Sequence, residues 1–176
     1  MTDPFKKPAP SFDDPLGMLM ACHERILGHC ETLLKLPGHL AEHGCDDEAR
    51  QAARRIHTYF STAGQDHHED EEQDIFPRVT SSSAALAEVI DGLRGQHARM
   101  DELWGRLEPL LTKPEAIEDA EGLRALAEEF AALYREHIAT ENQLIRDTFQ
   151  HLLSEAQLRE IGRSMAQRRN VDPQSL

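Results

Sequence analysis

Residues 67–77 carry the most unusual pattern in the chain. They read HHEDEEQDIFP and place two histidines and five acidic residues in their first eight positions. Such side chains form a metal site when they point into a protein core, and a solvated surface when they point to water. Their direction depends on the apolar residues that share their helix face. The rest of the chain therefore has to be organised into helices before these residues can be interpreted.

Helical periodicity dominates the sequence, and strand signals such as alternating β-branched residues or Asn-Gly turns are almost absent. The periodicity predicts long helices over residues 16–36, 46–78, 83–111 and 116–153. Pro37-Gly38 is expected to end the first helix. Ser154, followed by Gln157, predicts a capped fifth helix through Arg168. We therefore expect an all-α fold, an up-down-up-down four-helix bundle with a short C-terminal fifth helix.

The composition indicates a single globular domain. The chain has 176 residues, 39% of them hydrophobic, and we expect an extended N-terminal arm at 1–14 and the bundle domain at 15–170. The arm lacks the apolar core of a secretory signal, and no apolar run approaches the about 20 residues of a membrane span. The net charge of −13 argues against nucleic-acid and membrane partners. Three cysteines without a CxxC spacing favour a reducing, cytoplasmic location.

Each predicted long helix has an apolar stripe whose members are three or four residues apart and so share one face. A histidine lies near the middle of every stripe, and two stripes carry a glutamate one turn later. These six residues are His23, His67, Glu71, His97, His137 and Glu141. A single such histidine is usually a hydrogen-bonded core residue, but a buried, unpaired carboxylate is costly. One shared metal site would satisfy all six side chains together, and the sequence predicts it.

The apolar face of the second predicted helix indicates which of residues 67–77 point inward and which face water. His67 and Glu71 continue an apolar face, so we expect both to point inward, with His68 at the boundary. The acids expected to face water are Glu69, Asp70 and Glu72. The histidines expected at the surface are His29, His39, His43 and His151. Further polar residues that could point inward are His57, Tyr59, Asp101 and Tyr134, and His57 could touch the metal ligands.

The ligand set favours two iron ions. Four imidazoles and two carboxylates exceed the needs of one tetrahedral zinc, and calcium and magnesium prefer oxygen. Mixed nitrogen and oxygen ligation suits iron, with manganese or zinc as weaker alternatives. Bridging glutamates and a bridging oxide or hydroxide would fill about ten of the about twelve positions around two octahedral ions. About two positions would remain for a small ligand. No histidine follows a glutamate by three residues, so the ExxH motif of ferritin-like bundles is absent.

Four segments surround these residues: CHERI at 22–26, HHEDEEQDIFP at 67–77, GQHARMDEL at 95–103 and HIATENQLI at 137–145. In order, spacing and flanking apolar residues they closely resemble the hemerythrin-like, or HHE cation-binding, domain family. The resemblance covers residues 15–169 and implies a four-helix bundle with a non-haem di-iron centre. It implies that His23, His67, His97 and His137 are terminal ligands. It also implies that Glu71 and Glu141 bridge the irons.

Two positions depart from the oxygen-carrying hemerythrins. Asp101 stands where those proteins have a further histidine, and Glu141 where they have a bridging aspartate. The pattern is closer to a bacterial subgroup with four histidines and two glutamates, some of which are implicated in nitric-oxide response and iron–sulfur centre repair. Those repair proteins carry an extra N-terminal cysteine-containing domain, which we do not expect here. Asp101 either ligates metal or points to water, and the better fit of Met100 to the apolar stripe favours water.

Four functions are compatible with such a centre. The first is binding or sensing of a small diatomic ligand such as O₂ or NO. The others are redox catalysis on NO or peroxide, iron storage or delivery to iron–sulfur centres, and a purely structural use of the metal. The sequence shows no proton relay or substrate pocket beyond the metal, which favours binding over catalysis. The N-terminal arm and the fifth helix could pack on a second copy, so a homodimer remains an open alternative.

Overall fold

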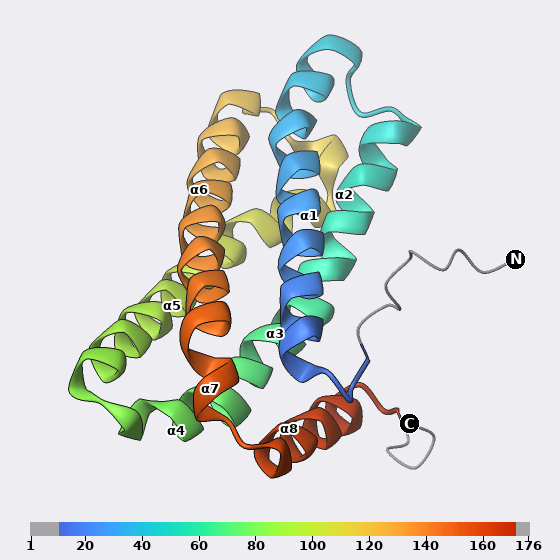
Figure 1. Cartoon of the computed structure of the whole chain (residues 1–176). Helices are drawn as coiled ribbons and strands as arrows, with labels where there is room; N and C mark the ends of the chain where they lie inside the picture. The colour runs from blue at the N-terminus through green and yellow to red at the C-terminus, as the bar shows by residue number, and fades with distance from the viewer. Residues whose placement is uncertain (1–10, 172–176) are drawn as a thin grey trace, which may run out of the picture.

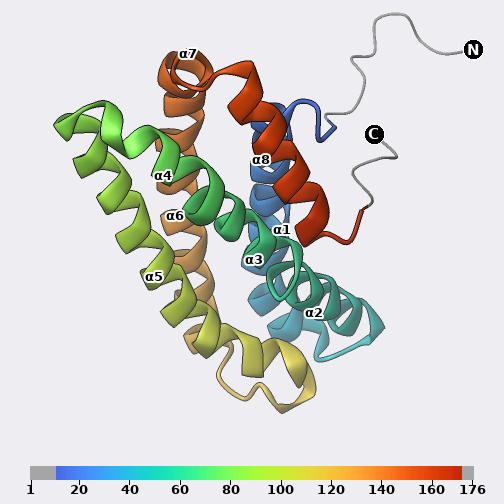
Figure 2. The ribbon, with the colours of Figure 1, turned by 90° about the horizontal axis from the view of Figure 1, so that it is seen from below.

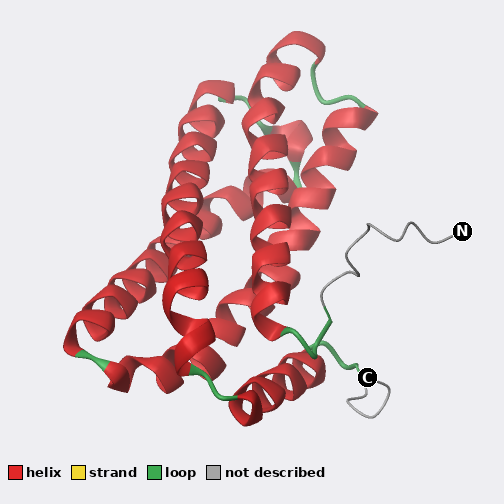
Figure 3. Ribbon diagram, in the orientation of Figure 1, coloured by secondary structure: helices red, strands yellow, loops and turns green. Residues whose placement is uncertain are grey.

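The chain folds into a bundle of four antiparallel helical segments, which we call the helical arms. The structure, a computed structural model, describes residues 11–171, so most of the expected N-terminal arm lies outside the described residues. Within that range every regular element is helical (Figure 3). The arms are α1 (Pro15–His43), an interrupted second arm, α5 (Ala84–Thr112) and α6 (Ala120–Leu144). Both α1 and α5 pack against α2 and α6 (Figure 1). The predicted all-α four-helix bundle is confirmed.

The second arm is not the continuous helix expected over 46–78. It consists of α2 (Asp47–Phe60), α3 (Ala63–Glu69), the π-helix η1 (Asp70–Ile75) and α4 (Phe76–Val79). The first break lies at Ser61 and Thr62, where the Thr62 hydroxyl donates to the Thr58 carbonyl at 2.7 Å. Hydroxyl side chains that bond to nearby backbone compete with the helical hydrogen-bond pattern. The π-helix then changes the direction of the side chains that follow it.

The predicted end of α1 at Pro37-Gly38 is also wrong. Pro37 is buried inside the helix, which continues to His43 and ends at Gly44. Gly44 has a φ of 69°, in the left-handed region that glycine adopts most easily, and its N–H donates to the Leu40 carbonyl at 2.9 Å. A proline inside a helix removes one backbone hydrogen bond. The burial of Leu33 and Leu36 on the same turns offsets that loss.

The later helix ends largely follow the sequence. Ser83 caps α5 by accepting a hydrogen bond from the Leu86 N–H at 3.1 Å. Ser154 and Gln157 form the predicted capping box of α8 (Glu155–Arg168). The fourth arm starts later than residue 116, because Asp119 caps α6 and the short 3-10 helix η3 (Pro114–Ala116) precedes it. After Leu144 this arm continues as the π-helix η4 (Ile145–Phe149) and α7 (Gln150–Leu152).

The core consists of two apolar clusters. One is built around Ile26, Met100 and Phe130, and the other, which we call the lower cluster, around Leu19 and Ile75. Helix α8 crosses the end of the bundle (Figure 2). Its apolar side chains pack into the lower cluster. All three cysteines are free thiols. Across residues 11–171, none of the helices has the length and apolar character needed to cross a membrane.

Candidate metal centre

Six buried polar side chains from all four arms meet between the two apolar clusters, and each is at most 5% exposed. They are His23 on α1, His67 on α3, Glu71 on η1, His97 on α5, and His137 and Glu141 on α6. The structure therefore brings together all six residues that the stripes predict as ligands. They come together because each lies at a similar depth on the inward face of its own arm.

The six side chains form two overlapping groups. His23 and His67 belong to one group and His97 and His137 to the other, while both glutamates belong to both. Within each group the potential ligand atoms lie within 4.8 Å of one another. Two groups that share two carboxylates have the layout of a two-cation site with bridging carboxylates.

All four imidazoles turn Nε2 toward the glutamates. His67 Nε2 lies 3.2 Å from Glu71 Oε1, and His97 Nε2 lies 3.3 Å from Glu71 Oε2. One carboxylate thus faces both groups with separate oxygens. His23 Nε2 and His137 Nε2 each lie 3.2 Å from Glu141 Oε2.

Several buried atoms at this centre have no hydrogen-bond partner among residues 11–171. They are His23 Nε2, both ring nitrogens of His67, both carboxylate oxygens of Glu71, and Glu141 Oε2. Buried polar atoms are nearly always paired, because leaving one unpaired costs free energy. Cations between the imidazoles and carboxylates would satisfy all but the outer nitrogen of His67. The donor set therefore fits a pair of metal ions.

Polar side chains lie within hydrogen-bond distance of Nδ1 in three of the imidazoles, on the side of the ring away from the centre. His23 Nδ1 lies 2.8 Å from Asn142 Oδ1, and His137 Nδ1 lies 3.0 Å from Gln96 Oε1. An Nδ1–H that donates to such an oxygen fixes the ring and leaves Nε2 free for metal. We did not predict Asn142 or Gln96 from the sequence. Each directly follows or precedes a proposed ligand, and this adjacency is the signal that could have indicated them.

Glu72 holds the third imidazole, which corrects the expectation that it faces water. Its side chain is half-buried, and Oε1 lies 2.8 Å from His97 Nδ1. Its other oxygen accepts from Arg94 Nε at 2.9 Å. Glu72 therefore orients His97 in the way that carboxylates orient metal-bound histidines.

Asp70 was also expected to face water, and it is fully buried. Arg168 and Arg169 of the C-terminal segment bind its carboxylate. Burial nevertheless raises the pKa of Asp70, against the opposing effect of the two arginines. Glu69, in contrast, is exposed as expected and lies 3.1 Å from Arg168.

The carboxylates perturb the imidazoles of the metal-free protein. Burial alone would lower the pKa of His23, but Glu141 and Glu71 outweigh it and raise the value to about 10. At His97 the nearby carboxylates, mainly Glu71, likewise outweigh the effect of burial and raise the pKa to about 9. At His67 burial prevails and lowers the pKa to about 4. The metal-free centre therefore carries protons that a bound cation would displace.

His68 lies half-buried beside the ligands. Its ring stacks on His97 with centroids 4.1 Å apart, and its Nε2 lies 3.2 Å from the Tyr134 hydroxyl. Burial, followed by the nearby His97 and His67, holds its pKa well below the usual value, so His68 is neutral. Tyr134 is 3% exposed, so its hydroxyl is removed from water.

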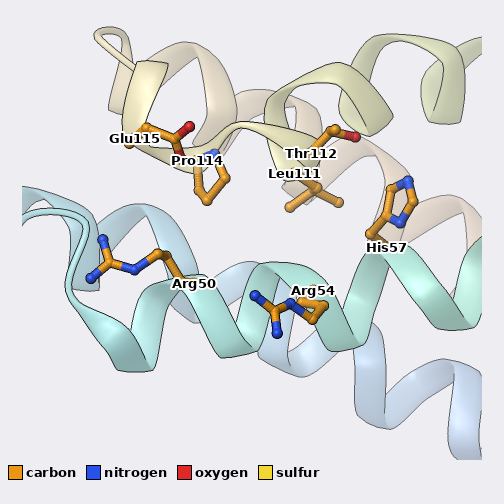
Figure 4. Close-up of a pocket in the computed structure, with 7 residues that line it drawn as sticks. All are labelled: Arg50, Arg54, His57, Leu111, Thr112, Pro114 and Glu115. Carbon is orange, nitrogen blue, oxygen red and sulfur yellow. The ribbon is translucent and has the colours of Figure 1, made fainter.

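Asp101 and His57 lie outside both ligand groups. Asp101 is exposed, whereas Met100 is buried, and Asp101 lines a surface hollow of about 590 Å³ that also reaches His97 and His68. His57 does not touch the centre. Its Nε2 lies 3.5 Å from Glu108 Oε1, and it lines a separate hollow that Figure 4 shows. The other histidines outside the ligand groups are His29, His39, His43 and His151.

A four-helix bundle with two overlapping histidine–glutamate groups in its core is the architecture of a cation-binding domain. The sequence matches the family described as "Hemerythrin HHE cation binding domain" over residues 14–149, and the chain belongs to this family. A protein of Haemophilus influenzae named "Uncharacterized protein" is 32% identical over 161 residues, which cover 92% of this chain and 93% of that protein. The family resemblance found in the sequence is confirmed.

Proposed function

We propose that this protein holds two iron ions at the six-residue centre and binds or senses a small ligand such as O₂ or NO there. The observation that carries the proposal is that both glutamates belong to both ligand groups. When bound, a pair of irons supplies electrons and open coordination positions for a diatomic ligand. Two imidazoles and two carboxylates would hold each ion, and with a bridging oxide or hydroxide they would leave about two octahedral positions open in all.

The surrounding residues support binding at a fixed site. Asn142, Gln96 and Glu72 hold three of the rings with Nε2 toward the centre. The apolar clusters on either side keep bulk water away from the carboxylates. The hollow beside Asp101 reaches the edge of His97, which offers small molecules an approach from solvent.

Metal analysis with absorption spectroscopy tests this proposal. Protein loaded with Fe(II) without oxygen should contain about two irons per chain. Exposure to O₂ or NO should change its near-ultraviolet and visible absorption. The variant His151→Ala, which changes an exposed histidine, should behave as the wild type. One zinc per chain, or no bound metal, would contradict the di-iron proposal.

One observation favours a second candidate, a redox enzyme that reduces NO or peroxide. The buried Tyr134 hydroxyl lies 3.2 Å from His68 Nε2, and His68 stacks on His97. A phenol and a neutral imidazole beside the centre could pass a proton between it and the hollow that His68 lines. In this case Tyr134→Phe should slow reductant-driven turnover of peroxide or NO but leave the iron content unchanged. Equal turnover in variant and wild type would refute the catalytic alternative.

A further inference from the structure

Two arginines at the end of α8 bind the acidic side of the π-helix η1. Arg169 Nη1 donates to Asp70 Oδ1 at 3.1 Å, and Arg169 Nη2 donates to Asp70 Oδ2 at 2.6 Å. Arg168 donates to the same carboxylate and, through Nη2, to Asp74 Oδ2 at 3.0 Å. We call this set, Arg168 and Arg169 with Asp70 and Asp74, the arginine clamp.

The clamp is shielded from water and has a defined geometry. The Asp70 side chain is 0% exposed, and those of Arg168 and Arg169 are 11% and 18% exposed. A guanidinium that binds both oxygens of one carboxylate fixes the orientation of that carboxylate. Asp70 therefore cannot turn without breaking hydrogen bonds to two arginines.

Glu71, the carboxylate that faces both ligand groups, directly follows Asp70 in the π-helix. Its oxygens lie 3.2 Å from His67 Nε2 and 3.3 Å from His97 Nε2, so a small rotation of η1 would move both contacts. A π-helix is a rare conformation that occurs mostly as a single turn within α-helices, frequently at functional sites. The clamp contacts η1 on Asp70 and Asp74 and so opposes such a rotation.

The helix that supplies the arginines is itself firmly seated. Ile161 and Met165 of α8 are 0% exposed in the lower cluster. Gly162 lies so close to the Phe12 backbone that a Cβ there would collide with the Phe12 carbonyl oxygen. The family match ends at residue 149, so α8 and its arginines lie beyond the matched residues.

We propose that Arg168 and Arg169 are positioning residues for the metal centre. Through Asp70 and Asp74 they hold η1 so that Glu71 faces both ligand groups, and α8 thereby sets how long the centre retains its cations. The inference rests on the proposed metal centre, but it does not depend on which metal occupies it.

Cobalt release tests the clamp, because Co²⁺ reports its own coordination through its visible absorption. The double variant Arg168→Met/Arg169→Met keeps the aliphatic stems and removes the charges. Loaded with Co²⁺ and mixed with excess chelator, it should lose metal about 10- to 100-fold faster than wild type, and its visible spectrum should shift. Arg163→Met is the matched control on an exposed position of α8 and should behave as wild type.

Two milder variants keep the test decisive if the double variant does not fold. Arg169→Lys keeps the charge but loses the two-point contact, and Asp74→Asn weakens one contact of Arg168. Each should release Co²⁺ at a rate between those of wild type and the double variant, or faster than wild type where the double variant is unfolded. A folded variant with wild-type release and an unchanged spectrum would overturn the clamp proposal, even if its thermal midpoint falls. Wild-type protein that binds neither Co²⁺ nor iron would overturn the proposed centre itself.

Discussion

Removing the Glu72 carboxylate should weaken metal binding without removing a proposed ligand. In the structure Glu72 Oε1 accepts from His97 Nδ1 at 2.8 Å, and this hydrogen bond keeps Nε2 directed at the centre. Loss of a group that orients a metal-bound histidine typically lowers affinity about 10- to 100-fold, or about 1.4–2.8 kcal/mol. Arg94 is 36% exposed and also contacts Asp91, so water can solvate it after the change. We therefore expect Glu72→Ala to fold and to bind metal about 10- to 100-fold more weakly than wild type.

The assay is a competition titration of Fe(II) or Co²⁺ against a chelator of known affinity, in wild type and in Glu72→Ala. The control is Glu88→Ala, which removes an exposed acid from α5 and changes the net charge equally. Comparison with this control separates the orientation of His97 from the general attraction of an acidic protein for cations. Equal affinities of Glu72→Ala and Glu88→Ala would refute the reasoning, and Glu72 would then be only a surface acid.

Four further predictions concern the centre. Glu141→Ala should reduce the metal content of both groups, because both share this carboxylate, and a protein that keeps one full equivalent would contradict the shared site. Metal binding at pH 7.5 should release about two protons, from His23 with a pKa of about 10 and His97 with a pKa of about 9, measurable by calorimetry in buffers of different ionisation enthalpy. Since both pKa values exceed the unfolded value near 6.5, urea titration should show metal-free protein losing stability as pH rises from 7 to 10. Asp101→Ala should leave the metal content unchanged, and a loss of metal would make Asp101 a ligand.

The bundle and the six central residues could be predicted because the relevant signal is local. Each histidine sits on an apolar stripe with spacings of three or four, so the inward face of each arm can be found without knowing its neighbours. The break at Thr62 did not hide His67 and Glu71, because the stripe resumes in α3 and η1. Similar depth on four arms was then enough to place the six side chains in one layer.

Asp70 and Glu72 could not be placed in this way, because their surroundings depend on tertiary contacts. An apolar stripe on a helix identifies one buried face and leaves the opposite face to solvent. The second arm has more than one buried face, because α8 covers Asp70 and Asp74 while His97 of α5 approaches Glu72. Nothing in the local pattern of residues 67–77 shows that a C-terminal helix will fold back over it.

The acids of residues 67–77 thus divide among separate partners. Glu71 faces the imidazoles of the centre, Glu72 holds His97 from behind, and Asp70 is bound by the arginine clamp. An amide in place of each acid removes one negative charge, so a model based on charge alone expects equal effects on metal binding. The structure instead predicts three outcomes: loss of metal for Glu71→Gln, weaker equilibrium binding for Glu72→Gln, and faster metal release for Asp70→Asn. The partner of each carboxylate, rather than the charge of the segment, determines what that residue contributes.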